Sequence, residues 1–449
     1  MDCSRFADFR TRLYACFGNG KAALMNACDA LLTETTASSF AELSLSPFFA
    51  RRWSSLYEAF DDATIDREAL RALFVAQTLQ MHAERANRRL VLAADASPIV
   101  RPQSRTARDR SYVHVPNLPK GTKPVAPGWQ FATVVALPET PSSWTTILDN
   151  RRIQSNQTAS QVVAQQLQAL APQLPEGTIV TCDGGFGNPT FLTQLQQLPS
   201  NTLSLLLRTA NNRTLYRPAP ERTGRRGAPR KDGDAFVMRD PSTHGTPSAV
   251  WQGKDARGDE RQVTVWEHLH FKPCRSTEVT LIRVLRLRDV RQNQQASAKA
   301  DREPPVLWLL WRGGELPSLA QIPDLYRLHY CIEHSYRFDK QELLWEQAHL
   351  RTPEKFETWT DVVSAVHNQI SLARFITTGI RQPWESNHRE PTPQQVRRAC
   401  ARIIAQLGTP APPPRVRGKS PGRRQGDKVR RAERFPTIFK QTNAKTKVV

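Results

Sequence analysis

Three carboxylates in three different settings are the residues of this sequence best suited to do chemistry. Asp95 lies within an apolar run at residues 89–100, and Asp183 comes at the end of a second apolar run. Continuous apolar runs of this length are typical of buried central strands, so each carboxylate is predicted at or near the end of a strand. The glycine-rich stretch 184–187 lets the backbone turn sharply there and leaves the second carboxylate uncrowded. The third carboxylate, Glu333, comes much later in the chain.

Glu333 lies among basic and aromatic residues in segment 324–341, which has the spacing of an amphipathic helix. At about 100° per residue, five side chains fall within roughly 80° of arc and share one face: Tyr326, His329, Glu333, Arg337 and Lys340. A neighbouring apolar stripe would bury the helix beside that face: Leu325, Leu328, Ile332 and Tyr336. Glu333 and Arg337 could instead form an ordinary ion pair on a solvated helix. The presence of Asp95 and Asp183 elsewhere in the chain favours a catalytic role for Glu333 over an ordinary ion pair.

Asp95, Asp183 and Glu333 together would offer only oxygen ligands, which suit hard divalent cations. Mg²⁺ commonly takes one or two carboxylates and completes its shell with substrate phosphate and water. Two such ions about 3.5–4 Å apart activate the attacking oxygen and stabilise the leaving oxygen of an in-line displacement at phosphorus. We therefore expect the three carboxylates to be both the catalytic residues and the ligands of two Mg²⁺ ions, with Mn²⁺ able to substitute.

The charge of the whole chain indicates a polyanionic partner. Its 449 residues include 63 Lys plus Arg against 42 Asp plus Glu, which gives a net charge of +21 and a pI near 10.2. Such an excess is typical of nucleic-acid binding, with attachment to a membrane surface as the rival interpretation. Because no apolar run is long enough to span a membrane and the first residues do not resemble a signal peptide, we expect a soluble, cytoplasmic protein with no membrane partner. Seven scattered cysteines argue against a disulfide framework and against structural zinc.

The elements that must position these carboxylates succeed one another in a recognisable order. From residue 89 onward the sequence predicts a strand with Asp95, two more strands, a helix, a strand with Asp183, another helix and an apolar strand at 203–208. This succession is similar to the ribonuclease H-like (RNase H-like) fold, in which the first and fourth strands lie side by side and a later helix supplies a third carboxylate. We therefore expect an α/β (α+β) protein with an RNase H-like mixed sheet flanked by helices.

Changes of pattern along the chain divide it into five regions. They are an N-terminal helical domain (1–85), the first part of the catalytic core (86–208), a β-rich insertion (209–300), the second part of the core with the Glu333 helix (301–380), and a C-terminal helix with a basic tail (381–449). The N-terminal domain would either recognise a DNA end or simply pack on the core. Alternating apolar and polar residues predict antiparallel strands in the insertion.

Two further stretches are strongly basic. A loop of the predicted insertion carries Arg225, Arg226, Arg230 and Lys231, which would either contact DNA or form a solvated charged loop. The last 35 residues hold twelve Lys plus Arg and two acidic residues. This tail is predicted to be disordered when free and to hold phosphates without reading sequence.

These motifs together resemble the DDE transposases of bacterial insertion sequences, in particular the group with a Tyr-x2-Arg-x3-Glu-x6-Lys signature and a β insertion before the last carboxylate. On this sequence the signature falls on Tyr326, His329, Glu333 and Lys340, with His329 where the pattern has Arg. The segments LAADASPI, PGWQFATV and DGGFGNP carry further resemblance.

The resemblance implies cut-and-paste transposition: hydrolysis at each terminal inverted repeat with Mg²⁺, then attack of the freed 3′-hydroxyl on target DNA, with no covalent enzyme intermediate. It implies a bacterial, nucleoid-associated protein that acts as a homodimer on its DNA. It also implies that Tyr326, His329, Arg337 and Lys340 contact DNA. Imidazole lacks the bidentate, permanently charged grip of a guanidinium, so His329 would hold phosphate less firmly. Two alternatives therefore stay open: a transposase-derived DNA-binding protein that no longer cuts, and a structure-selective nuclease on the same fold.

Overall fold

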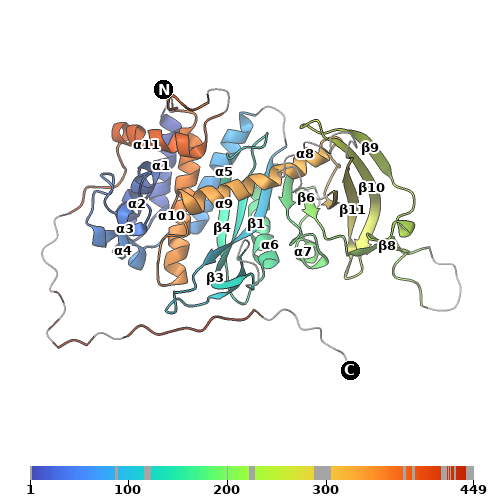
Figure 1. Ribbon diagram of the computed structural model, residues 1–449, viewed down its shortest axis with the longest axis horizontal. Helices are drawn as coiled ribbons and strands as arrows, with labels where there is room; N and C mark the ends of the chain where they lie inside the picture. The colour runs from blue at the N-terminus through green and yellow to red at the C-terminus, as the bar shows by residue number, and fades with distance from the viewer. Residues whose placement is uncertain are drawn as a thin grey trace.

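The computed structural model describes most of the chain, and its parts lie along one long axis (Figure 1). The described residues are 3–85, 89–115, 123–199, 201–221, 228–287, 305–377, 381–386, 390–415, 422, 424, 426–428 and 431–440. Helices from both ends of the chain gather at one end of that axis, and the strands of the insertion lie at the other. The middle is the sheet that carries Asp95.

Within the described residues, twelve strands form one sheet in the order β2-β3-β1-β5-β6-β12-β11-β10-β7-β8, with β4 paired to β3 and β9 to β10. Their bounds are β1 Val91–Val100, β2 Ser111–His114, β3 Val125–Ala136, β4 Thr146–Ile153, β5 Thr178–Cys182, β6 Leu203–Arg208, β7 Thr214–Tyr216, β8 Ala235–Val237, β9 Ala249–Lys254, β10 Glu260–Phe271, β11 Cys274–Arg286 and β12 Val306–Arg312.

Strands β4, β3, β1, β5 and β6 form the RNase H-like part of the sheet. β1 pairs antiparallel with β3 and parallel with β5, and β5 pairs parallel with β6. The expected side-by-side placement of the first strand and the strand before Asp183 is therefore confirmed. β1 is longer than predicted: it runs five residues past Asp95, because its pairing with β3 continues to Val100 after its pairing with β5 has ended at Ala94.

Different helices pack on the two faces of this sheet. Leu92 and Ala94 of β1 share an apolar cluster with Val163 and Leu167 of helix α6 (Ala159–Leu170). Ala93, which alternation points the other way, belongs to the cluster of Ile332. Asp95 comes two residues after Ala93, so it lies on the face that carries the Glu333 helix.

The insertion does not form a separate sheet. β10 and β11 are antiparallel as predicted, but β11 also pairs with β12, and β12 pairs antiparallel with β6. The insertion therefore extends the core sheet edge to edge (Figure 1). Trp308 and Trp311 on β12 are buried, so they belong to the apolar core.

Helices from the two ends of the chain share one apolar core. The N-terminal helices are α1 Ser4–Cys16, α2 Lys21–Thr33, α3 Phe40–Leu43, α4 Trp53–Asp62 and α5 Arg67–Ala83, and the C-terminal ones are α10 Pro353–Ala373 and α11 Pro393–Leu407. Trp359 of α10 packs edge-on against Phe40 and Phe60, with ring centroids 5.2 and 5.8 Å away. The side chain of Thr392 caps α11 in a capping box with Gln395. Among the described residues, no helix is long and apolar enough to cross a membrane.

Segment 324–341 is not one regular helix. It divides into α8 (Ile322–Arg327), a 3₁₀ turn at Leu328–Tyr330 and α9 (Cys331–Gln341). A 3₁₀ turn advances about 120° per residue rather than about 100°, so it rotates α9 relative to α8. The single face expected from the sequence is therefore split: Tyr326 and His329 are buried, whereas Glu333 and Arg337 are exposed.

Part of the basic tail lies against the sheet rather than free of it. The backbone N–H groups of Phe435 and Ile438 donate to the carbonyls of Arg105 and Arg110, at 2.8 and 2.7 Å. The rings of Tyr112 and Phe439 are 4.5 Å apart. For residues 431–440 the expectation of disorder is corrected, because the start of β2 and the loop before it offer backbone partners that the sequence of the tail does not reveal.

Candidate active site

Asp95 and Asp183 lie at the same level of two neighbouring strands. The last parallel pair between β1 and β5 is Ala94 with Cys182, and each carboxylate comes directly after it. Neighbouring strands are about 4.8 Å apart, and equal steps past a parallel pair point side chains to the same face. The sheet thus places the two aspartates next to one another.

The turn after Asp183 holds its carboxylate through the backbone. The N–H of Gly185 donates to Asp183 Oδ1 at 2.9 Å. A Cβ on Gly187 would lie 1.9 Å from the carbonyl oxygen of Arg208, so only glycine fits there. Asn188 then caps helix α7 (Pro189–Gln194) by accepting from the N–H of Phe191. The sequence predicts that these glycines leave the Asp183 carboxylate uncrowded. In the structure they also determine the path of the turn, because Gly187 passes close to the backbone of Arg208.

Two contacts, one on each side of Glu333, hold its helix over the aspartates. Four residues before it, His329 Nδ1 shares a hydrogen bond of 3.2 Å with Oγ1 of Thr181, which is two residues from Asp183 on β5. Three residues after it, the hydroxyl of Tyr336 donates to the backbone carbonyl of Asp95 at 2.9 Å. One helical turn is about 5.4 Å. Glu333 is therefore within about one turn of each aspartate strand, because the contact before it reaches β5 and the contact after it reaches β1.

The pKa of Asp95 reports the electrostatics of this arrangement. This pKa is raised from 3.8 to about 7, chiefly by burial, and the charges of Asp183 and Glu333 contribute in the same direction. The backbone N–H of Ala96 opposes these effects. Both other carboxylates are thus close enough to make ionisation of Asp95 unfavourable.

A divalent cation would fit this arrangement of carboxylates. It would favour the ionised form of Asp95, which burial and two like charges otherwise disfavour. In the described part of the chain, no three Asp, Glu, His or Cys side chains are gathered closely enough to coordinate one ion by themselves. Asp95 and Asp183 would therefore hold one ion as a pair, and Glu333 beside them would be available to a second, with substrate phosphate and water supplying the other ligands.

Two residues of the predicted DNA-contacting face lie in the interior. Only 3% of Tyr326 and 4% of His329 is exposed, and their rings stack with centroids 5.8 Å apart. Burial lowers the pKa of His329 to about 4, so its imidazole is neutral at physiological pH. The expectation that these two side chains meet DNA phosphates is corrected: the 3₁₀ turn directs them to the sheet, where His329 anchors the helix instead.

The other predicted DNA contacts are more accessible. Arg337 is exposed and its guanidinium lies 2.6 Å from His334 Nδ1. Lys340 is half-buried: its ammonium donates to the carbonyl of Pro98 and pairs with Glu346, each at 2.7 Å. In the basic loop, Arg230 is exposed and pairs with Asp234 at 3.3 Å, and Lys231 is exposed. Arg225 and Arg226 lie outside the described residues.

Sequence patterns do not single out the residues that hold α9 in place. Periodicity assigns Tyr336 to the apolar stripe, yet its hydroxyl reaches β1. Asp339 pairs with His367 of α10 at 2.7 Å, and both are buried. The local signal for either of them is a polar group one or two turns from Glu333.

A comparison with protein families found a match to the family described as DDE superfamily endonuclease, over residues 12–270. This match covers more than half of the chain and includes both aspartates, and it ends before α9. No curated protein that was compared with the sequence matches it.

Proposed function

The chain belongs to the DDE superfamily endonuclease family, and from that premise we propose that it is a DNA transposase of the cut-and-paste type. Membership of this family indicates a nuclease-type enzyme that acts on DNA, and such enzymes generally use divalent metal ions. The finer proposal is hydrolysis at the terminal inverted repeats of a mobile element, followed by joining of the freed ends to a target. The observation that carries it is the anchoring of α9 through His329 and Tyr336, which brings Glu333 to the paired aspartates.

We assign a role to each of the three carboxylates. Asp95 and Asp183 would hold two Mg²⁺ ions between them, with Glu333 completing the site, and Mn²⁺ would serve in their place. When bound, the ions lower the pKa of the attacking oxygen and neutralise charge on the leaving one. Water attacks phosphorus, the bond to the 3′-oxygen breaks, and that oxygen leaves as a hydroxyl. The same hydroxyl then attacks a target phosphodiester and displaces its 3′-oxygen.

The surrounding residues would hold the DNA or the catalytic helix. We propose that Arg337, Lys340, Arg230 and Lys231 contact phosphates, as do Arg225 and Arg226. Tyr326 and His329 act as positioning residues, because their burial keeps them from the strand itself. Two ends must be cut for one element to move, so we propose a homodimer on the DNA.

The test is cleavage of a linear DNA that carries the flanks of this reading frame, in the presence of Mg²⁺. Asp95→Ala, Asp183→Ala and Glu333→Ala should each reduce cleavage at least about a thousandfold, because each removes part of the carboxylate site. Asp8→Ala is the matched control, since Asp8 is an exposed carboxylate on α1 paired with Arg12 at 3.7 Å. Full cleavage by any of the three active-site variants would refute the assignment.

One observation favours a second function. His329 stands where the signature has Arg, and it is buried and neutral. A transposase-derived protein that binds ends without cutting would retain the fold and the basic surface. This second function predicts that the protein binds the end sequence without breaking the strand in Mg²⁺ or Mn²⁺. Cleavage of branched DNA regardless of terminal sequence would instead identify a structure-selective nuclease.

A further inference from the structure

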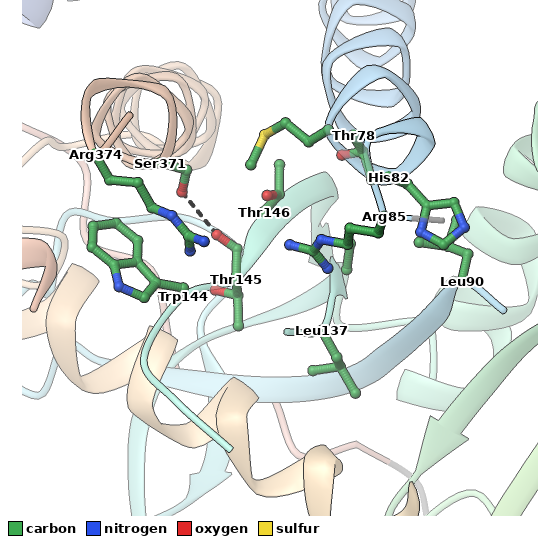
Figure 2. Close-up of a pocket in the computed structure, with 12 residues that line it drawn as sticks. Thr78, His82, Arg85, Leu90, Leu137, Trp144, Thr145, Thr146, Ser371 and Arg374 are labelled. Carbon is green, nitrogen blue, oxygen red and sulfur yellow. Dashed lines mark hydrogen bonds between the residues drawn. The ribbon is translucent and has the colours of Figure 1, made fainter. Parts of the chain in front are cut away.

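A small polar pocket lies between the end of α5, the end of α10 and the loop before β4 (Figure 2). It measures about 20 Å³, which is room for one water-sized group such as a single oxygen of a phosphate. Its polar lining includes Arg85, Arg374, Thr78 and Thr146. None of these residues has a part in the proposed carboxylate site.

Two guanidinium groups point into this pocket from opposite sides. Figure 2 shows Arg374 reaching in beside Trp144 and Arg85 facing it across the space near Thr146. Burial lowers the pKa of Arg374, and the charge of Arg85 lowers it further, so the two cations are close enough to repel one another. Repulsion of this kind is relieved when an anion lies between the cations.

Acidic side chains only partly offset this positive charge. Arg374 pairs with Glu390 at 3.3 Å, and that carboxylate is 52% exposed, so solvent screens the pair. The guanidinium also lies over the ring of Trp144, with 5.0 Å from its carbon to the ring centroid. Within the residues that the structure describes, the side chain of Arg85 has no hydrogen bond or ion pair. At least one guanidinium therefore keeps its donors available.

A buried hydroxyl at the same pocket also has no partner. Thr78 is 3% exposed, and its Oγ1 makes no hydrogen bond to any described residue. An unsatisfied buried hydroxyl is costly, and most such groups in proteins bind a partner. The nearby Thr145 is already occupied: its carbonyl accepts from Ser371 at 2.9 Å, and its hydroxyl bonds Ser335 at 2.7 Å. Thr78 thus has a free donor beside two cations.

We propose that this pocket receives one oxygen of a DNA backbone phosphate, held by Arg85 and Arg374 and by the hydroxyl of Thr78. The net charge of +21 favours DNA over free phosphate as the source of that group. This inference rests on the proposed function, because it adds a phosphate contact to the same DNA complex.

The position of the pocket suggests which phosphate it holds. Leu90 lines the pocket and directly precedes β1, and Asp95 is five residues further on. At about 3.3 Å per residue, that separation is roughly 17 Å along the strand. One DNA strand carries a phosphate about every 3.4 Å of helix axis, so on a duplex that runs parallel to β1 the bound phosphate would be about five nucleotides from the scissile one. The pocket would fix how far the duplex extends past the cut.

The experiment measures binding of a fluorescent duplex by anisotropy across a range of KCl concentrations, in EDTA so that no cleavage occurs. We expect Arg85→Ala to weaken binding and to reduce the slope of log Kd against log [KCl] by about 0.9, the value for one lost phosphate contact. Thr78→Val, which has the same shape without the hydroxyl, should weaken binding about tenfold and leave the slope unchanged. Arg12→Ala removes one exposed cation from α1 and is the control for net charge.

Inorganic phosphate is the second probe. It should raise the melting temperature of the wild-type protein and have no such effect on Arg85→Ala. A phosphate effect together with unchanged DNA affinity in Arg85→Ala would overturn DNA as the ligand. The proposed site would be refuted if Arg85→Ala and Thr78→Val gave the same results as the control Arg12→Ala in both assays. If the wild-type protein did not bind DNA, the proposed function would be refuted instead.

Discussion

Replacing Asp95 with asparagine should stabilise the metal-free protein at alkaline pH. The pKa of this carboxylate rises from 3.8 in the unfolded chain to about 7 in the fold, because of burial, Asp183 and Glu333. The stability that its protonated form supports is fully present below pH 3.8, falls as pH rises, and is lost above about 7. The asparagine side chain cannot ionise, so the variant escapes this loss.

The size of the effect depends on the two pKa values of Asp95. A rise from 3.8 to about 7 corresponds to at most about 4 kcal/mol at pH 8. The side chain is half-buried, and solvent screens part of the interaction, so we expect about 1–3 kcal/mol. Near pH 4 the wild type and the variant should be within about 0.5 kcal/mol of each other, since both are then uncharged at this position in the folded protein.

Urea denaturation at pH 4, 6 and 8 in EDTA measures this difference. The advantage of Asp95→Asn should grow with pH and disappear when Mg²⁺ is added to both proteins. Asp8→Asn, which neutralises an exposed carboxylate, should show no comparable trend. A stability difference that is independent of pH, or an Asp95→Asn protein that is less stable at pH 8, would refute the clustering of the three carboxylates.

Three further variants test how the fold holds the site. Tyr336→Phe removes the hydroxyl bond from α9 to β1, so DNA cleavage should fall about tenfold while the unfolding free energy drops by only about 1 kcal/mol, as urea titration would show; unchanged cleavage would exclude the anchor. Gly187→Ala should cost more than about 3 kcal/mol or prevent folding, because its Cβ would meet a backbone carbonyl at 1.9 Å, and circular dichroism would detect the loss. Asp339→Asn leaves His367 without its buried partner and should cost about 3–5 kcal/mol. Because Asp339 raises the pKa of His367, that cost should shrink above the ordinary histidine range, and a pH-independent cost would show that the pair is not charged.

Local patterns predict the elements of the site well. The apolar runs that precede Asp95 and Asp183 are adjacent parallel strands, and the cap of α11 lies at Thr392. These features depend on residues within a few positions of each other, so the sequence encodes them directly. The capping box of α6, formed by Thr158 and Gln161, is local in the same sense.

Features that depend on distant contacts are not predictable in the same way. The 3₁₀ turn at Leu328–Tyr330 turns His329 toward Thr181 of β5, a contact across 148 residues. The N-terminal helices likewise pack against α10, which is far from them in the chain. In the same way, β12 pairs with β6 across a long separation in sequence. Periodicity assigns faces to each segment but carries no information on which faces meet.

The most direct test of the carboxylate site is Mn²⁺ binding, measured by electron paramagnetic resonance on the protein bound to duplex DNA. We predict that Asp95→Ala, Asp183→Ala and Glu333→Ala each weaken Mn²⁺ binding at least about tenfold, whereas Asp8→Ala does not. Wild-type Mn²⁺ affinity in any one of the three variants would place that carboxylate outside the metal site and contradict the proposed chemistry.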